Sequence, residues 1–173
     1  YSSNFLAAGK QEKVNAVYLA SLSKQEIGGA TANIAITGNE FTYHDGKKYK
    51  GYYNFYNIGA TSDANAAING LYFAAGKPVV ENGKIVIQTN YHRPWNTPEK
   101  AIVGGANFIS EKYISHAQST SYFKKWNVVA NYAKKNGLSA NSLYSNQYMT
   151  NIQAPSSEAV SVYNSYAKLN KLN

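Results

Sequence analysis

Residues 14–29 read VNAVYLASLSKQEIGG, and this stretch decides the fold. Apolar side chains recur within it at helical spacing, at Val14, Val17, Tyr18 and Leu22. The spacing predicts an amphipathic helix from about Glu12 to Gln25, which ends at the glycine pair 28–29. The residue between helix and glycines, Glu26, is therefore expected at a helix C-terminus.

Glu26 is the candidate for acid chemistry on residue type and position alone. The negative end of the helix dipole opposes its ionisation, and nearby apolar groups desolvate the carboxylate. Both effects raise the pKa, as a general acid working near neutral pH requires. The glycines at 28–29 would let a substrate approach the backbone. A solvated glutamate at a helix end is the alternative reading of the same pattern.

Length and composition predict a globular protein with a single domain over residues 1–173. We expect this domain to be excised from a larger secreted protein. The 44% hydrophobic content excludes wholesale disorder, and no apolar run approaches the ~18 residues of a membrane-spanning helix. Charged residues make up only 15%, so polarity comes mainly from amides, hydroxyls and 16 tyrosines. Such groups suit neutral glycans, and they suit a stable extracellular fold equally well.

The net charge of +8 favours an anionic environment, such as acidic wall polymers. The only arginine is Arg93, and sequence-reading nucleic-acid proteins depend on arginine, so we expect no specific nucleic-acid partner. There is no cysteine, which excludes disulfides and thiol nucleophiles. The three histidines share no ligand spacing, so neither a metal nor a cofactor is expected.

Local patterns predict an α+β chain. An Asp-Gly pair at 45–46 predicts a β-hairpin between aromatic-rich arms, and the Asn-Gly pair at 82–83 predicts a second one over residues 79–87. Helical patterns cover 62–72, follow Thr97-Pro98-Glu99 and open at Pro155, whereas 30–40 read as a loop. The glycines at 104–105 lie inside the third helix, which predicts close approach of a neighbouring helix.

The sequence lacks the motifs of serine hydrolases and of phosphate-binding loops. Neither a Gly-x-Ser-x-Gly elbow nor a phosphate-binding Gly-x-x-x-x-Gly-Lys loop occurs, which leaves the nine carboxylates. All but Glu26 and Glu40 have a structural interpretation. Asp45 and Glu81 belong to turns, Glu12 and Glu111 sit in helices beside lysines, and Asp63, Glu99 and Glu158 read as helix starts.

Six segments form an ordered set: VNAVYLA at 14–20, QEIGGAT at 25–31, YNFYNIGA at 53–60, WNTPEKAIVGGA at 95–106, YFKKWN at 122–127 and QYMTNI at 147–152. In this order they resemble the catalytic domains of N-acetylglucosaminidase autolysins, glycoside hydrolase family 73, most of all the clostridial type. Ile27 departs from the family's small hydroxyl residue, Ala16 from a proline, and Asn146 from a frequent histidine.

The resemblance implies a lysozyme-like α+β fold, with a cleft between a mostly helical lobe and a small β-hairpin lobe. It implies an endo-β-N-acetylglucosaminidase that cleaves the β-1,4 bond after N-acetylglucosamine in peptidoglycan. Glu26 falls on the family's catalytic glutamate, and Tyr148 on a tyrosine near the reaction centre. Glu40, at the start of the first hairpin, is either the base that activates water or a solvated strand-entry residue. The mechanism could be inverting, retaining or assisted by the substrate's N-acetyl group.

Substrate contacts are expected from aromatic faces and amides, which bind sugars by stacking and hydrogen bonding. The candidates are Tyr53, Asn54, Phe55, Asn57, Trp95 and Gln147. If the segment around residue 54 alternates, half of its rings should pack in the core instead.

Two other functions fit the same sequence: a muramidase or lytic transglycosylase on the same fold, and a non-catalytic module that binds cell wall. In each case the expected partners are peptidoglycan glycan strands and anionic wall polymers. We expect a secreted, wall-associated monomer that does not insert into membranes.

Overall fold

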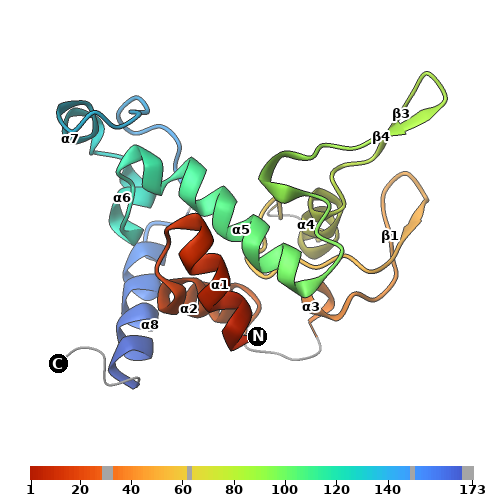
Figure 1. Cartoon of the computed structure of the whole chain (residues 1–173), viewed down its shortest axis with the longest axis horizontal. Coiled ribbons are helices and arrows are strands. Elements are labelled where there is room, and N and C mark those ends of the chain that lie inside the picture. The colour runs from red at the N-terminus through yellow and green to blue at the C-terminus, as the bar shows by residue number, and fades with distance from the viewer. Residues whose placement is uncertain (29–32, 62–63, 149–150, 169–173) are drawn as a thin grey trace.

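The structure, a computed structural model, describes residues 1–28, 33–61, 64–148 and 151–168. Figure 1 shows a helical lobe that contains α1, α2, α6, α7 and α8, and a second lobe that contains α3, α4 and both hairpins. The long helix α5 runs from one lobe to the other. This two-lobed α+β arrangement agrees with the lysozyme-like fold that the family resemblance implies. No helix among the described residues is long and apolar enough to cross a membrane.

The helices of the first lobe are α1 (Ser2–Glu12), α2 (Ala16–Glu26), α6 (Ser121–Trp126), α7 (Ala130–Lys135) and α8 (Ala154–Lys168). The connecting helix is α5 (Pro98–Lys112), and the second lobe holds α3 (Ile34–Thr37) and α4 (Ala66–Ala74). Two short 3₁₀ helices, η1 (Asn90–His92) and η2 (Ile114–His116), flank α5.

Both predicted hairpins are confirmed. Strand β1 (Phe41–Thr42) pairs antiparallel with β2 (Lys48–Tyr49), and β3 (Val79–Glu81) pairs antiparallel with β4 (Lys84–Val86). Gly46 and Gly83 have φ of 76° and 75°, the left-handed conformation that these turns require and that glycine adopts without strain.

The helix predicted from Glu12 to Gln25 begins later than expected. Lys13 has φ 56° and ends α1, and the side chain of Asn15 then accepts hydrogen bonds from the first backbone amides of α2. Glu12 therefore closes α1, a helix that the apolar spacing did not reveal. Residues 34–37, predicted as loop, form the short α3, whereas the predicted start of α5 is confirmed by the Thr97 cap.

The main core is one cluster of side chains from α1, α2, α4, α5 and the segments that precede α4 and α5. Its fully buried side chains include Leu19, Leu22, Tyr56, Trp95, Ile102 and Ile109. A methyl group added at Gly104 would lie 2.1 Å from Trp95, and one at Gly105 would lie 2.1 Å from the ring of Tyr56. The two glycines thus admit aromatic rings, not the neighbouring helix that we predicted.

Candidate active site

A cleft of about 500 Å³ opens at the C-terminal end of α2. Its lining comes from four separate parts of the chain: Glu26, the turn Tyr56–Asn57–Ile58–Gly59–Ala60, the pair Phe108 and Tyr113, and the pair Tyr148 and Asn151. Glu26 is the one carboxylate among these lining residues. The cleft therefore combines an acid with aromatic rings and amides, the groups expected to bind a sugar.

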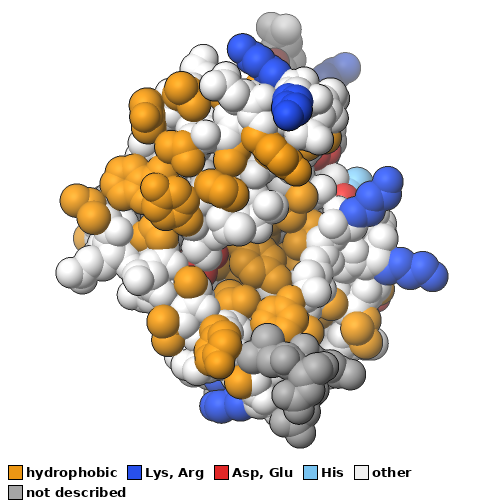
Figure 2. Space-filling model, turned by 90° about the vertical axis from the view of Figure 1, so that its left-hand side faces the viewer, with side chains coloured by type: hydrophobic (Ala, Val, Ile, Leu, Met, Phe, Trp, Pro, Cys, Tyr) orange, Lys and Arg blue, Asp and Glu red, His pale blue; other side chains and the backbone are white. Residues whose placement is uncertain are grey.

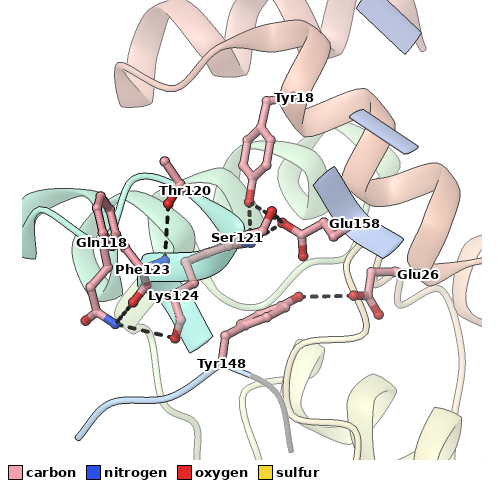
Figure 3. A network of polar contacts seen from close by, with 9 residues as sticks. All are labelled: Tyr18, Glu26, Gln118, Thr120, Ser121, Phe123, Lys124, Tyr148 and Glu158. Carbon is pink, nitrogen blue, oxygen red and sulfur yellow. Dashed lines mark hydrogen bonds and ion pairs between the residues drawn. The ribbon is translucent and has the colours of Figure 1, made fainter. Parts of the chain in front are cut away.

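Glu26 has the environment that its place in the sequence predicted. The hydroxyl of Tyr148 donates a hydrogen bond of 3.2 Å to Oε1 of Glu26, as Figure 3 shows. Burial raises the pKa of the Glu26 carboxyl, whereas the bond from Tyr148 lowers it; the negative charge of Glu158 adds to the rise, and Lys124 opposes it. The balance keeps the pKa above its ordinary value, which favours a protonated acid.

Asn57 joins the turn 56–60 to the end of α2, since its amide donates a hydrogen bond of 2.5 Å to the backbone carbonyl of Glu26. Asn57 has φ 50° and Gly59 has φ 78°, so the turn relies on two left-handed residues. Of the predicted substrate contacts, Asn57 is the one that lines the cleft.

Three predicted sugar contacts lie in the interior instead. Asn54, Phe55 and Trp95 are 1%, 2% and 0% exposed. The segment has no strand, so its side chains do not alternate between core and cleft. None of these three side chains is among the described residues that line the cleft, so their positions do not support direct contact with a sugar there.

Asn54 still matters to the cleft, because it fixes the turn that lines it. Its amide group donates to the carbonyls of Ile58 and Gly70 at 2.8 and 2.9 Å, and its oxygen accepts from the amide of Ile58 at 3.1 Å. A buried amide with both ends bonded holds this backbone in one shape.

The remaining predicted residues lie outside the set that lines the cleft. Glu40 is exposed and pairs with Lys48 at 2.9 Å. Gln147 is exposed, and its side chain bonds the backbone of Tyr144 and the ammonium of Lys125. Tyr53 is half-buried with its hydroxyl against Gly38. The predictions for Gly29 and Asp63 lie outside the described residues.

Sequence reasoning missed a polar cluster behind Tyr148. Glu158, predicted as a helix-start charge, is fully buried and pairs with Lys124 at 2.7 Å. Ser121 and Tyr18 also donate to this carboxylate, at 2.7 and 3.3 Å (Figure 3). Glu158 lies 34 residues from Lys124 in the chain, so no local pattern could pair them.

The loop that carries Tyr148 is held by the side-chain amides of Gln118 and Asn146. Gln118, fully buried, donates to the carbonyls of Phe123 and Asn146 at 3.0 and 3.1 Å. Asn146 in turn donates to the carbonyl of Lys112 at 2.6 Å and to the oxygen of Gln118 at 2.9 Å. Asn146, a departure from the family pattern, thus anchors the loop to the end of α5.

A second hollow is larger, about 740 Å³, but lacks acid chemistry. It lies between α6 and α8 and is lined mostly by apolar and aromatic side chains, among them Tyr18, Trp126, Ile152, Val162 and Tyr163. Figure 2 shows that hydrophobic side chains gather on this side of the molecule. No carboxylate lines this hollow within the described part of the chain, so the cleft beside Glu26 is the better candidate.

Among the residues that the structure describes, no three acidic or histidine side chains gather closely enough to hold a metal ion.

The lysozyme-like α+β fold, with Glu26 as the one carboxylate among the described residues that line its cleft, defines the class as a glycoside hydrolase domain. The bifunctional autolysin of Staphylococcus epidermidis is 32% identical over 127 residues, 71% of this chain and 8% of that protein. The β-N-acetylglucosaminidase of Bacillus subtilis (strain 168) is 34% identical over 129 residues, 73% of this chain and 12% of that protein. No protein-family model matches.

Solved structures agree with these relatives. Crystal structures of Staphylococcus aureus autolysin E superpose with a TM-score of 0.62 at 26% identity, covering 97% of this chain and 60% of that one. One is a catalytic glutamate-to-alanine mutant in complex with the disaccharide NAG-NAM, and another holds the muropeptide NAM-L-Ala-D-iGlu. The chain belongs to the autolysin glucosaminidases, glycoside hydrolase family 73. It spans about a tenth of the length of the curated relatives it matches.

Proposed function

We propose that this chain is an endo-β-N-acetylglucosaminidase that hydrolyses the β-1,4 bond after N-acetylglucosamine in peptidoglycan. The observation that carries the proposal is Glu26, an acid with a raised pKa in a cleft of aromatic rings and amides. The relatives named autolysin and β-N-acetylglucosaminidase support it, as does the autolysin E complex with NAG-NAM.

Glu26 acts as the general acid. It gives its proton to the glycosidic oxygen while the bond from C1 to that oxygen breaks and the electron pair stays on the oxygen. Protonation of the leaving group in this way contributes about 10²–10⁴-fold to such reactions. Tyr148, hydrogen-bonded to Glu26 at 3.2 Å, holds the carboxyl toward the cleft.

The N-acetyl group of the substrate serves as the nucleophile. Glu26 is the one carboxylate among the described residues of the cleft wall, whereas inverting and retaining pairs need a second one. The carbonyl oxygen of the N-acetyl group attacks C1 and forms a cyclic oxazolinium ion. Water then attacks C1, the ring opens, and the Glu26 carboxylate takes the proton from that water.

The stereochemistry of the product tests this step. Two displacements at C1 retain the anomeric configuration, so proton NMR of a short glycan during hydrolysis should first show the β-anomer. First release of the α-anomer would show single inversion and would require a base, for which Glu40 is the candidate.

Replacement of the acid tests the assignment as a whole. Glu26→Gln keeps the shape of the side chain and removes its proton, so clearing of purified cell walls should fall by at least about 100-fold. Glu111→Gln, which removes an exposed carboxylate on α5, is the matched control. Clearing by Glu26→Gln at the wild-type rate would overturn the proposal, and wall binding without any release by the wild-type domain would favour a binding module.

The bond that is cut is read from the products. Mass spectrometry of the released fragments should show N-acetylglucosamine at the reducing end. Reducing N-acetylmuramic acid would indicate a muramidase, and an anhydro sugar would indicate a lytic transglycosylase.

We further propose that the +8 charge holds the domain, as a secreted monomer, on anionic wall polymers. Attraction between surface charges is screened over ~10 Å at 0.1 M salt, so adsorption to walls should fall as salt rises. Adsorption that does not change with salt would contradict this mode of binding.

A further inference from the structure

A buried ion pair lies directly behind Tyr148, one of the residues that line the cleft. Nζ of Lys124, on α6, is 2.7 Å from Oε1 of Glu158, on α8, and the two side chains are 3% and 0% exposed. Taking two charges out of water is costly, and apolar residues of similar size often give equal or greater stability. Stability alone is therefore a weak explanation for this pair.

Among the described residues, all hydrogen bonds to the carboxylate of Glu158 go to one of its two oxygens. Its Oε1 accepts from Lys124, Ser121 and Tyr18, whereas its Oε2 is buried without a partner among the described residues. Because all three donors bind the same oxygen, these contacts fix the orientation of the Glu158 side chain. Tyr18 also accepts a hydrogen bond from Lys124.

Lys124 in turn contacts Tyr148 in two ways. Its Nζ lies 4.5 Å from the centre of the Tyr148 ring, a cation–π distance, and its backbone carbonyl accepts from the amide of Tyr148 at 3.0 Å. Tyr113 meets the same ring edge-on at 5.4 Å. The ring is thus held by Lys124 and Tyr113, and its hydroxyl is left to reach Glu26 (Figure 3).

We propose that Lys124 and Glu158 are positioning residues, a charge-balanced pair that holds the ring of Tyr148 so that its hydroxyl meets Glu26. The inference rests on the proposed function, because it concerns the same acid. The negative charge of Glu158 neutralises the positive charge of Lys124. An ammonium group beside Tyr148 without a counter-ion would favour the ionised form of Glu26, and a general acid must keep its proton.

The test replaces the charges and keeps the shape. Lys124→Met combined with Glu158→Gln removes both charges and leaves an acceptor for Ser121 and Tyr18. We expect the double variant to fold with a melting temperature close to the wild type, to lose at least about 10-fold in kcat, and to keep KM within about twofold. A folded double variant with wild-type kcat would overturn the proposal.

A double-mutant cycle shows whether the pair acts through Tyr148. In the background of Tyr148→Phe, which lacks the hydroxyl, replacement of the pair should cost no more than about twofold in kcat. Lys125→Met is the matched control: it removes another buried cation of α6, whose Nζ reaches Gln147 at 3.3 Å and the ring of Trp126 at 5.0 Å. Its effect on kcat should be the same with and without the Tyr148 hydroxyl.

Independent effects of the pair and of Tyr148 would refute the positioning role even if both lower kcat. If the double variant does not fold, the single variant Glu158→Gln, studied below its melting temperature, enters the same cycle with the same expectation. If the proposed function itself is wrong and Glu26 is not the general acid, the Glu26→Gln variant would remain active. Loss of activity in Glu26→Gln together with independent effects in the cycle would refute only this inference.

Discussion

Tyr148 and Glu26 stand 122 residues apart in the chain and share a hydrogen bond of 3.2 Å across the cleft. The bond stabilises the ionised carboxylate and therefore lowers the pKa of Glu26, against the rise that burial causes. One hydroxyl thus both orients the acid and limits how tightly the acid holds its proton. A general acid needs both properties, because it must be protonated before the reaction and must release its proton during it.

Removal of this bond should shift the pH dependence of activity. In Tyr148→Phe the carboxylate loses a donor, so the pKa of Glu26 rises further. The fall of kcat/KM on the alkaline side reports the acid of the free enzyme, so that limb should move to higher pH. Rates measured on a soluble glycan across the pH range test this. A limb at the wild-type position would mean that another group controls it.

Glu26 should also cost the protein stability at neutral pH. Its folded-state pKa lies above the unfolded value, so the native state binds the extra proton, and stability falls as pH rises through the interval between the two values. Glu26→Gln does not titrate and keeps an acceptor for Tyr148. Its melting temperature should therefore exceed that of the wild type at pH 8 by more than at pH 4.

Thermal unfolding at the two pH values measures this difference. Glu111→Gln, on the exposed face of α5, controls for the loss of one negative charge. An equal difference at both pH values would show that Glu26 titrates as an ordinary surface carboxyl, which would remove the physical basis for its role as an acid.

Patterns of neighbouring residues correctly predicted the elements that depend on contacts between residues close in the chain. The two hairpins follow from Asp-Gly and Asn-Gly turns, and α5 follows from the Thr97 cap with proline next to it. The position of Glu26 at the end of α2 followed from apolar spacing and a glycine pair. Each signal is carried by residues within one or two turns of each other, so a single sequence was enough to predict them.

The failures have a common cause in contacts over long distances in the chain. Asn54 and Phe55 were assigned to the cleft, but the segment forms turns and buries consecutive side chains, so polarity and aromatic character did not show which way they point. Glu158 has the spacing of a helix-start charge, and only the position of Lys124 on α6 gives it a buried partner. Pairing of this kind depends on tertiary packing.

Gly105 should be intolerant of even one methyl group. Alanine usually stabilises a helix by about 1 kcal/mol relative to glycine. Here the added Cβ would lie 2.1 Å from the buried ring of Tyr56, and overpacking of this kind costs typically about 1–3 kcal/mol. We expect Gly105→Ala to lower the free energy of unfolding in urea, and to lower kcat because Tyr56 lines the cleft.

The partner ring provides the control. In the background of Tyr56→Leu the aromatic ring is absent, so Gly105→Ala should cost less than in the wild type. The difference between the two costs measures the clash. Equal costs in both backgrounds would place the strain elsewhere on α5.

Glu40 offers the sharpest test of the single-carboxylate mechanism. Its side chain is 51% exposed, and the 2.9 Å pair with Lys48 lies on the surface, where such pairs contribute little. We therefore expect Glu40→Gln to keep kcat within about twofold, because loss of a catalytic base would lower it by about 10²–10⁴-fold. Lys48→Met breaks the same ion pair and leaves the carboxylate in place. Equal, small effects of the two variants would confirm a surface role, whereas a large loss confined to Glu40→Gln would make Glu40 the base that activates water and would require an inverted product.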